Sequence, residues 1–319
     1  MSSSISVSFR RGITTRAALA AAAVLLPALA EPCSICRCGD ATFNALGKDG
    51  YAARGWRLAA DWERFDKEEG DPAEESEAQV ENRFTALVSY GLRERFTLLA
   101  RLPVSVRDLE ASAPGAPTET IHTSGLSDPE LYAQARLWAS AMAGSVGRRA
   151  SLSLTAGVKA PWGQNEATRD GLRVDEHAQP GTGSTDLFGS LSFLYLFDKE
   201  SALFATAGYR HTGENDLGYR YGRSVLANLA YEHKLGGRWD GVIELNFRNA
   251  AQDQVDAEGT RDGDTGGSLL YLTPRLLFNV GEGLVLRAAV QIPIVRDLNG
   301  FQKERAVVNV GLTYLLGGQ

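Results

Sequence analysis

Residues 268–295 read SLLYLTPRLLFNVGEGLVLRAAVQIPIV, two long segments of alternating apolar and polar side chains joined at Gly281-Glu282-Gly283. Alternate residues of a β-strand point to opposite faces, so a period of two predicts one apolar and one polar face on each segment. Both segments are longer than the usual strand of about five to six residues. A barrel strand needs about 9 to 11 residues to cross a membrane. The pair therefore predicts a transmembrane β-hairpin.

The same alternation recurs along the chain and indicates about twelve strands. Tight turns and longer polar loops separate them alternately, and in outer-membrane barrels short turns face the periplasm. We therefore predict an all-β fold, a transmembrane antiparallel up-and-down β-barrel over 55–319, with both termini periplasmic. The long loops include 67–77, 109–124 and 162–182. The predicted strands are 55–66, 84–90, 96–104, 131–137, 152–158, 187–197, 202–211, 225–231, 239–247, 268–280, 284–294 and 306–316.

The first thirty residues have the composition of a cleaved secretory signal peptide. Its basic residues are Arg10, Arg11 and Arg16. The apolar stretch 18–26 follows them, and Ala28-Leu29-Ala30 supplies the small-x-small pattern that precedes cleavage. We predict a signal peptide over 1–30, a periplasmic cysteine-containing segment over 31–54, and a location in the outer membrane of a Gram-negative bacterium.

Charge and hydropathy restrict the partners. The formal net charge of −6 gives no argument for nucleic-acid binding. The mean hydropathy of −0.19 does not argue against the membrane, because lipid-facing and lumen-facing residues of a barrel alternate and their hydropathy averages out. The expected partners are the outer-membrane lipid bilayer, small-molecule solutes and a periplasmic protein, with no nucleic acid.

The predicted register places many charged side chains inside the barrel. Burying charges in an apolar interior is very costly, so these groups line water or pair with one another. Barrels of about 8 strands are filled by their own side chains, while about 16 to 18 strands leave an open channel. A narrow polar pore and a lumen closed by ion pairs both remain open. The pore-lining candidates are Arg57, Asp61, Glu63, Arg101, Arg136, Lys159, Glu244, Arg248, Arg275 and Arg287.

The only cysteines of the chain, Cys33, Cys36 and Cys38, lie close together before the first predicted strand. In an oxidising periplasm two of them could form a disulfide, which leaves one over. Three thiolates could instead bind a soft metal, Cu(I) or Zn(II), with a fourth ligand from a partner. No other cofactor follows from the sequence, and both interpretations stay open.

Five segments occur in an order that is similar to a known family. They are Gly125-Leu126-Ser127-Asp128-Pro129-Glu130-Leu131, Ala160-Pro161-Trp162-Gly163, Gln179-Pro180-Gly181-Thr182-Gly183-Ser184-Thr185-Asp186, Arg296-Asp297-Leu298-Asn299-Gly300 and Gly311-Leu312-Thr313-Tyr314. Together they resemble the outer-membrane proteins of the MetA-pathway phenol-degradation family, over most of 55–316. The resemblance implies a small outer-membrane barrel that transports aromatic or other hydrophobic compounds and supplies no catalytic residues. The N-terminal Cys-x-x-Cys-x-Cys segment departs from the family pattern.

These features predict an outer-membrane porin-like channel or transporter for small molecules, not an enzyme. One alternative is a structural or partner barrel in metal or electron traffic, which the cysteine segment suggests. The other is an outer-membrane hydrolase, for which Ser, His and an acidic group must meet. His122, His177 and His211 lie near the predicted outer rim with Ser124 and Ser184, although no Gly-x-Ser-x-Gly surrounds these serines.

Overall fold

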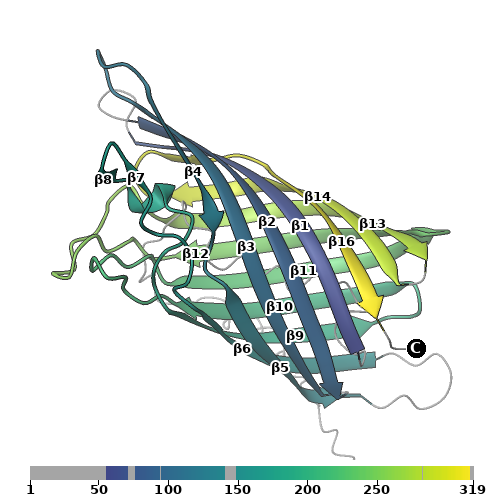
Figure 1. Ribbon diagram of the computed structural model, residues 1–319. Helices are drawn as coiled ribbons and strands as arrows, with labels where there is room; N and C mark the ends of the chain where they lie inside the picture. The colour runs from purple at the N-terminus through teal and green to yellow at the C-terminus, as the bar shows by residue number, and fades with distance from the viewer. Residues whose placement is uncertain (1–54, 71–75, 94, 141–148, 282, 317–319) are drawn as a thin grey trace, which may run out of the picture. The chain divides into compact units, whose positions relative to one another are not determined.

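In the computed structural model, the described residues are 55–70, 76–93, 95–140, 149–281 and 283–316. Within them, twelve antiparallel strands form a closed barrel (Figure 1). The first strand, β1, pairs with β2 on one side and with β16 on the other, which closes the sheet. The barrel strands are β1 (Gly55–Glu69), β2 (Ser76–Arg93), β3 (Phe96–Ser112), β5 (Glu130–Ala139), β6 (Arg149–Lys159), β9 (Asp186–Leu196), β10 (Ser201–His211), β11 (Ser224–Gly236), β12 (Trp239–Ala250), β13 (Gly267–Gly281), β14 (Leu284–Leu298) and β16 (Val307–Leu316). The predicted fold class is confirmed.

The alternation seen in the sequence separates an apolar outer face from a polar inner face. On β14, Leu286 and Ile292 are exposed on the outside, while Arg287 and Gln291 between them are buried. In a bilayer each backbone polar group must be satisfied within the protein, and a closed barrel achieves this through its inter-strand ladder. Among the described residues, no helix is long and apolar enough to cross a membrane.

Outward aromatic side chains gather where the strands meet the short turns. Trp56 packs on Tyr90 with ring centroids 4.5 Å apart, and Trp239 packs on Phe278 at the same distance. Outer-membrane barrels carry such aromatic girdles at the level of the lipid headgroups, because the rings are amphipathic. The girdle thus indicates one boundary of the membrane-embedded band.

Two of the predicted loops are partly strand, which corrects the sequence interpretation. Residues 67–77 include the end of β1 and the start of β2, and 109–124 include the end of β3 and most of β4 (Glu119–Leu126), which pairs with β3. A further short strand, β15 (Gln302–Glu304), pairs with the end of β1. Figure 1 shows β4 and the ends of β1 to β3 at the long-loop end of the barrel. Strand segments beyond the lipid face water on both sides, so their apolar and polar residues need not alternate. In the sequence such segments look like loops.

The third predicted loop, 162–182, has structure of its own. It contains the small hairpin of β7 (Thr168–Arg169) and β8 (Leu172–Arg173), followed by the short 3-10 helix η4 (Glu176–Ala178). All three residues of η4 are buried. We call residues 160–185 the mouth loop, because side chains from several barrel strands hold it at the long-loop end.

One buried apolar cluster lies in the interior near the short turns. Ala202, Phe204, Ala230, Val242 and Leu277, from four neighbouring strands, form one buried cluster on the inward face. Arg57, Glu232 and Asp240 are buried at the same end of the barrel, so charged side chains border this apolar cluster.

Candidate functional site

All ten charged candidates stand on inward faces of barrel strands. Asp61, Arg101 and Arg136 are half-buried. The buried ones are Arg57, Glu63, Lys159, Glu244, Arg248, Arg275 and Arg287. Charges removed from bulk water in this way need ionic or hydrogen-bonding partners.

Within the described part of the chain, ion pairs join some of the candidates with each other. Arg287 Nη2 lies 2.7 Å from Asp61 Oδ1, across β16, and Arg287 also donates to Thr313. Arg275 Nε lies 2.6 Å from Glu244 Oε1, between neighbouring strands. The first pair joins β14 to β1, and the second joins β13 to β12.

Glu130 is the centre of a larger network on the opposite wall. Its Oε2 lies 2.7 Å from Arg101 Nη1 and accepts from the Tyr132 hydroxyl at 2.8 Å. Its Oε1 lies 2.7 Å from Arg210 Nη2. Sequence reasoning missed Glu130 and Arg210. The sequence could have predicted Arg210, because it lies four residues after Thr206 on β10 and alternate side chains of a strand point to the same face.

A second set of contacts continues the network toward the mouth loop. Lys159 Nζ lies 2.9 Å from Asp186 Oδ2 and 3.3 Å from Asp128 Oδ2. Arg210 Nη1 lies 3.4 Å from the same Asp186 oxygen. Ser184 donates to Asp186 Oδ1 at 3.1 Å. The predicted candidates Lys159 and Arg101 thus belong to one connected group of charges.

Asp128 brings together three of the segments that carry the family resemblance. Its Oδ1 accepts from the Gly163 amide at 2.9 Å. Its Oδ2 accepts from the Thr182 amide at 2.8 Å and the Thr182 hydroxyl at 2.6 Å. The backbones at Gly163 and Gly181 approach so closely that a Cβ on Gly181 would lie 2.7 Å from Gly163 Cα. Segments that look like separate turns in sequence therefore form one folded unit.

Barrel strands hold the mouth loop through its backbone carbonyls. The His177 carbonyl accepts from Gln79 Nε2 at 2.9 Å and from Arg107 Nη1 at 2.7 Å. The Ala178 carbonyl accepts from the Thr123 hydroxyl at 2.5 Å. Buried backbone groups are costly without partners, so these contacts stabilise the loop in place.

Two further loops contact η4 from the other side. The Tyr219 hydroxyl donates to Asp253 Oδ2 at 2.6 Å and lies 3.0 Å from His177 Nε2. The Tyr221 hydroxyl donates to the Glu176 carbonyl at 3.0 Å. The mouth loop is therefore held on both sides.

Glu176 is the titratable group of this loop whose ionisation is clearly perturbed. Burial raises the pKa of its carboxyl, although Arg173 Nη2 lies 2.9 Å from one carboxylate oxygen. Asn215 Nδ2 donates to the other oxygen at 3.1 Å. Burial penalises the charged carboxylate and raises the pKa of Glu176 by more than the attraction of Arg173 lowers it.

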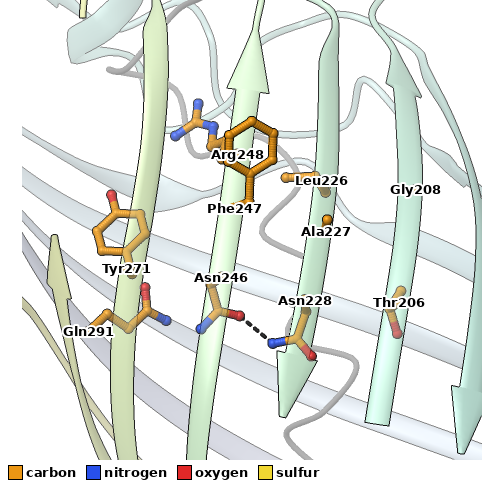
Figure 2. A pocket seen from close by; sticks show the side chains of 10 residues that line it. All are labelled: Thr206, Gly208, Leu226, Ala227, Asn228, Asn246, Phe247, Arg248, Tyr271 and Gln291. Carbon is orange, nitrogen blue, oxygen red and sulfur yellow. Dashed lines mark hydrogen bonds between the residues drawn. The ribbon is translucent and has the colours of Figure 1, made fainter. Parts of the chain in front are cut away.

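Two open spaces adjoin the networks. The first, a cavity of about 50 Å³, is lined by five cations that we call the basic site. They are Arg83, Arg101, Arg107, Lys159 and Arg210. The second, a cavity of about 30 Å³ that we call the polar pocket, is lined by Leu226, Arg248 and a row of uncharged polar side chains. Figure 2 shows this row across β10 to β14, namely Thr206, Asn228, Asn246, Tyr271 and Gln291.

The side chains considered for a hydrolase have separate partners. His122 Nδ1 lies 2.7 Å from Asp108 Oδ1, and both groups are exposed. His177 contacts Tyr219, and Ser184 donates to Asp186. Cys33, Cys36 and Cys38, with the predicted disulfide or metal site, lie outside the described residues.

The closed barrel, the apolar outer face, the aromatic girdle and the charged interior define a transmembrane β-barrel of the outer-membrane type. The sequence signature of the MetA-pathway of phenol degradation family matches residues 85–297, more than half of the chain. The chain belongs to this family. No curated protein matches it in sequence.

Solved structures share the fold at low sequence identity. The COG4313 outer membrane channel from Pseudomonas putida F1 is similar with a TM-score of 0.63 and 15% identity, over 85% of this chain and 98% of that one. The transport unit of the autotransporter AIDA-I from Escherichia coli gives 0.49 and 12%, over 85% and 92%. The CymD monoaromatic hydrocarbon channel gives 0.41 and 9%, over 83% and 89%.

Proposed function

We propose that the protein is an outer-membrane channel for small solutes, including aromatic or other hydrophobic compounds, with its short turns and both chain ends on the periplasmic side. One observation carries the proposal. The interior of the barrel holds connected charged groups next to small cavities of about 30 and 50 Å³, instead of a packed apolar core. Charges inside a membrane protein are expensive and usually mark a path for ions or solutes.

The mouth loop makes such a channel selective rather than wide. It is fastened through Asp128, through the carbonyls of His177 and Ala178, and through Tyr219, so it narrows the long-loop end of the lumen. The apolar cluster around Phe204 narrows the short-turn end. A solute would pass two narrow regions with a polar section between them. The similarity in fold to a protein named an outer membrane channel supports this reading.

The test is single-channel recording on the purified protein in planar bilayers. We expect small, discrete conductance steps for the wild type. We expect larger steps for Asp128→Asn, because the amide replaces an acceptor of the Gly163 and Thr182 amides and loosens the mouth loop. If neither protein conducts, the barrel is closed and the channel proposal is wrong.

The cysteine segment is tested in the same recordings. We propose that Cys33, Cys36 and Cys38 form a disulfide or bind a soft metal beside the periplasmic end of the lumen. Reductant should change the conductance in the first case, and Cu(I) or Zn(II) should bind the wild type but not Cys36→Ser in the second. Identical behaviour of both proteins in both assays would contradict the proposal.

A further inference from the structure

A third cavity, which we call the junction cavity, lies where side chains of five barrel strands meet inside the lumen. Its volume is about 10 Å³. A cavity needs about 10–15 Å³ to admit one water molecule, so this one has room for a single small particle. The lining comes from β1, β2, β3, β13 and β16, and includes Asp61, Thr85, Leu87, Arg101, Arg275 and Asn309.

Two buried oxygen atoms at the junction cavity need a partner. Thr85 and Asn309 are each only 4% exposed. Thr85 Oγ1 and Asn309 Oδ1 have no hydrogen-bond partner among the described residues. Most buried polar atoms of native proteins are hydrogen-bonded, and an exception points to a bound water or ion. Both residues line the same cavity, so one ligand there would satisfy both oxygens.

The chemistry of the lining favours a neutral ligand that donates hydrogen bonds. Asn309 Oδ1 only accepts, whereas the Thr85 hydroxyl both accepts and donates. Arg101 and Arg275, which also line the cavity, only donate and would repel a metal ion. Among the described residues, no group of acidic, histidine or cysteine side chains is arranged to hold a metal. A water molecule donates twice and accepts twice, which suits this mixture of acceptors and donors.

The junction cavity also lies between ion pairs that are otherwise separate. Asp61, Arg101 and Arg275 each belong to a different pair, with distances of 2.7, 2.7 and 2.6 Å between the charged atoms. One of these pairs stands on the wall of β3 and β5, and the other two stand on the opposite wall. A ligand in the cavity therefore contacts the charged groups of both walls.

Arg101 extends this region toward the mouth loop. It lines both the junction cavity and the basic site. The basic site, at about 50 Å³, has room for a few water molecules by the same measure of about 10–15 Å³ each. The polar interior is therefore suited to hold water from the junction cavity to the mouth loop.

We propose that the junction cavity holds one ordered water molecule, which hydrogen-bonds to Asn309 Oδ1 and to the Thr85 hydroxyl and joins the charged groups of the two walls across the lumen. The inference goes beyond the proposed channel function and does not depend on conduction. It adds a hydrated junction that, in this conformation, admits a particle of about the size of water.

The experiment is X-ray hydroxyl-radical labelling of the wild-type barrel, read out by mass spectrometry. Radicals formed from a bound water oxidise the side chain beside it. Leu87 lines the junction cavity, and the matched control Leu277 lines neither this cavity, nor the basic site, nor the polar pocket. Both leucines are 7% exposed, so radicals from bulk water reach them equally. We expect faster oxidation of Leu87, and equal oxidation of the two would overturn the proposal.

A second measurement asks whether the Thr85 hydroxyl is hydrogen-bonded. Thr85→Val keeps the shape of the side chain and removes the hydroxyl. With the water in place, the variant should shift the unfolding equilibrium in urea by about fivefold toward the unfolded state, the effect of one hydrogen bond. Without the water, the valine removes an unsatisfied oxygen, so an unchanged or more stable barrel would contradict the proposal.

The control for this variant is Thr120→Val, at an exposed position on β4, which should stay within about twofold of the wild type. Neither measurement uses conductance. A barrel that conducts but oxidises both leucines equally would overturn the bound water and leave the channel in place. A barrel with a rapidly oxidised Leu87 and no conductance would instead overturn the channel and support the water.

Discussion

Replacing Glu130 by Gln tests whether the charged network holds the barrel together. The substitution keeps the shape of the side chain but removes its charge and presents an NH2 group to one of the arginines. Glu130 is buried and lies 2.7 Å from both Arg101 Nη1 and Arg210 Nη2. After the change, Arg210 keeps one ionic contact, at 3.4 Å with Asp186, and the Tyr132 hydroxyl at 3.3 Å.

The expected cost follows from what remains unpaired. Removing one partner of a buried ion pair destabilises a protein by about 3–5 kcal/mol, because the other charge stays buried without compensation. We therefore expect Glu130→Gln to lower the free energy of unfolding by about 3–5 kcal/mol, which is about two to three and a half powers of ten in the unfolding equilibrium. Adding Arg101→Gln should recover part of this loss, because one of the two orphaned cations is gone.

The assay is unfolding in urea from lipid vesicles, followed by tryptophan fluorescence. The matched control is Glu110→Gln, an exposed carboxylate on β3, which should stay within about 0.5 kcal/mol of the wild type. A Glu130→Gln barrel as stable as the control would refute the reasoning. It would mean that water, not Glu130, compensates the two arginines.

Three further changes probe other parts of the lumen. Phe204→Ala should raise the single-channel conductance, because the buried ring narrows the lumen near the short turns, whereas Phe197→Ala on the exposed face should not. Burial raises the pKa of Glu176 above its ordinary 4.5, so docking of the mouth loop is most stable below that pH and weakens as pH rises through the raised pKa. Conductance should therefore increase with pH, and Glu176→Gln should flatten that increase. Gly157→Ala places a Cβ 2.1 Å from the Tyr132 ring and should cost about 1–3 kcal/mol in urea unfolding; an unchanged midpoint would contradict this packing.

The sequence was sufficient to predict the barrel because the bilayer imposes the same rule on every strand. Outward positions must be apolar, so a strand such as β14 alternates without a break from Leu286 to Ile294. The rule ends where the lipid ends. For this reason the outer parts of β1 to β4, around Lys67 and Ile121, read as loops although they pair as strands.

The interior was harder to predict, because its contacts join strands that are distant in sequence. The alternation of side chains predicts that Arg101 and Lys159 point inward, but it does not predict their partners Glu130 and Asp186. Glu130 and Arg210 are 80 residues apart, and the successive pairing of β5, β6, β9 and β10 brings them together. The same holds for the three segments that meet at Asp128. In the sequence each looks like a separate turn, whereas in the structure they form one folded unit.

The seam between β1 and β16 has a consequence for how the barrel is made. Trp56 pairs with Leu316, so the closing ladder joins the two ends of the barrel domain. Contacts of such large sequence separation form late and slowly, because the loop entropy is lost before the contacts are gained. Until then both edge strands carry open backbone groups, which lipid cannot satisfy. Membrane insertion and closure are therefore expected to be one event, and a chain that lacks β16 should fail to insert rather than form a smaller barrel.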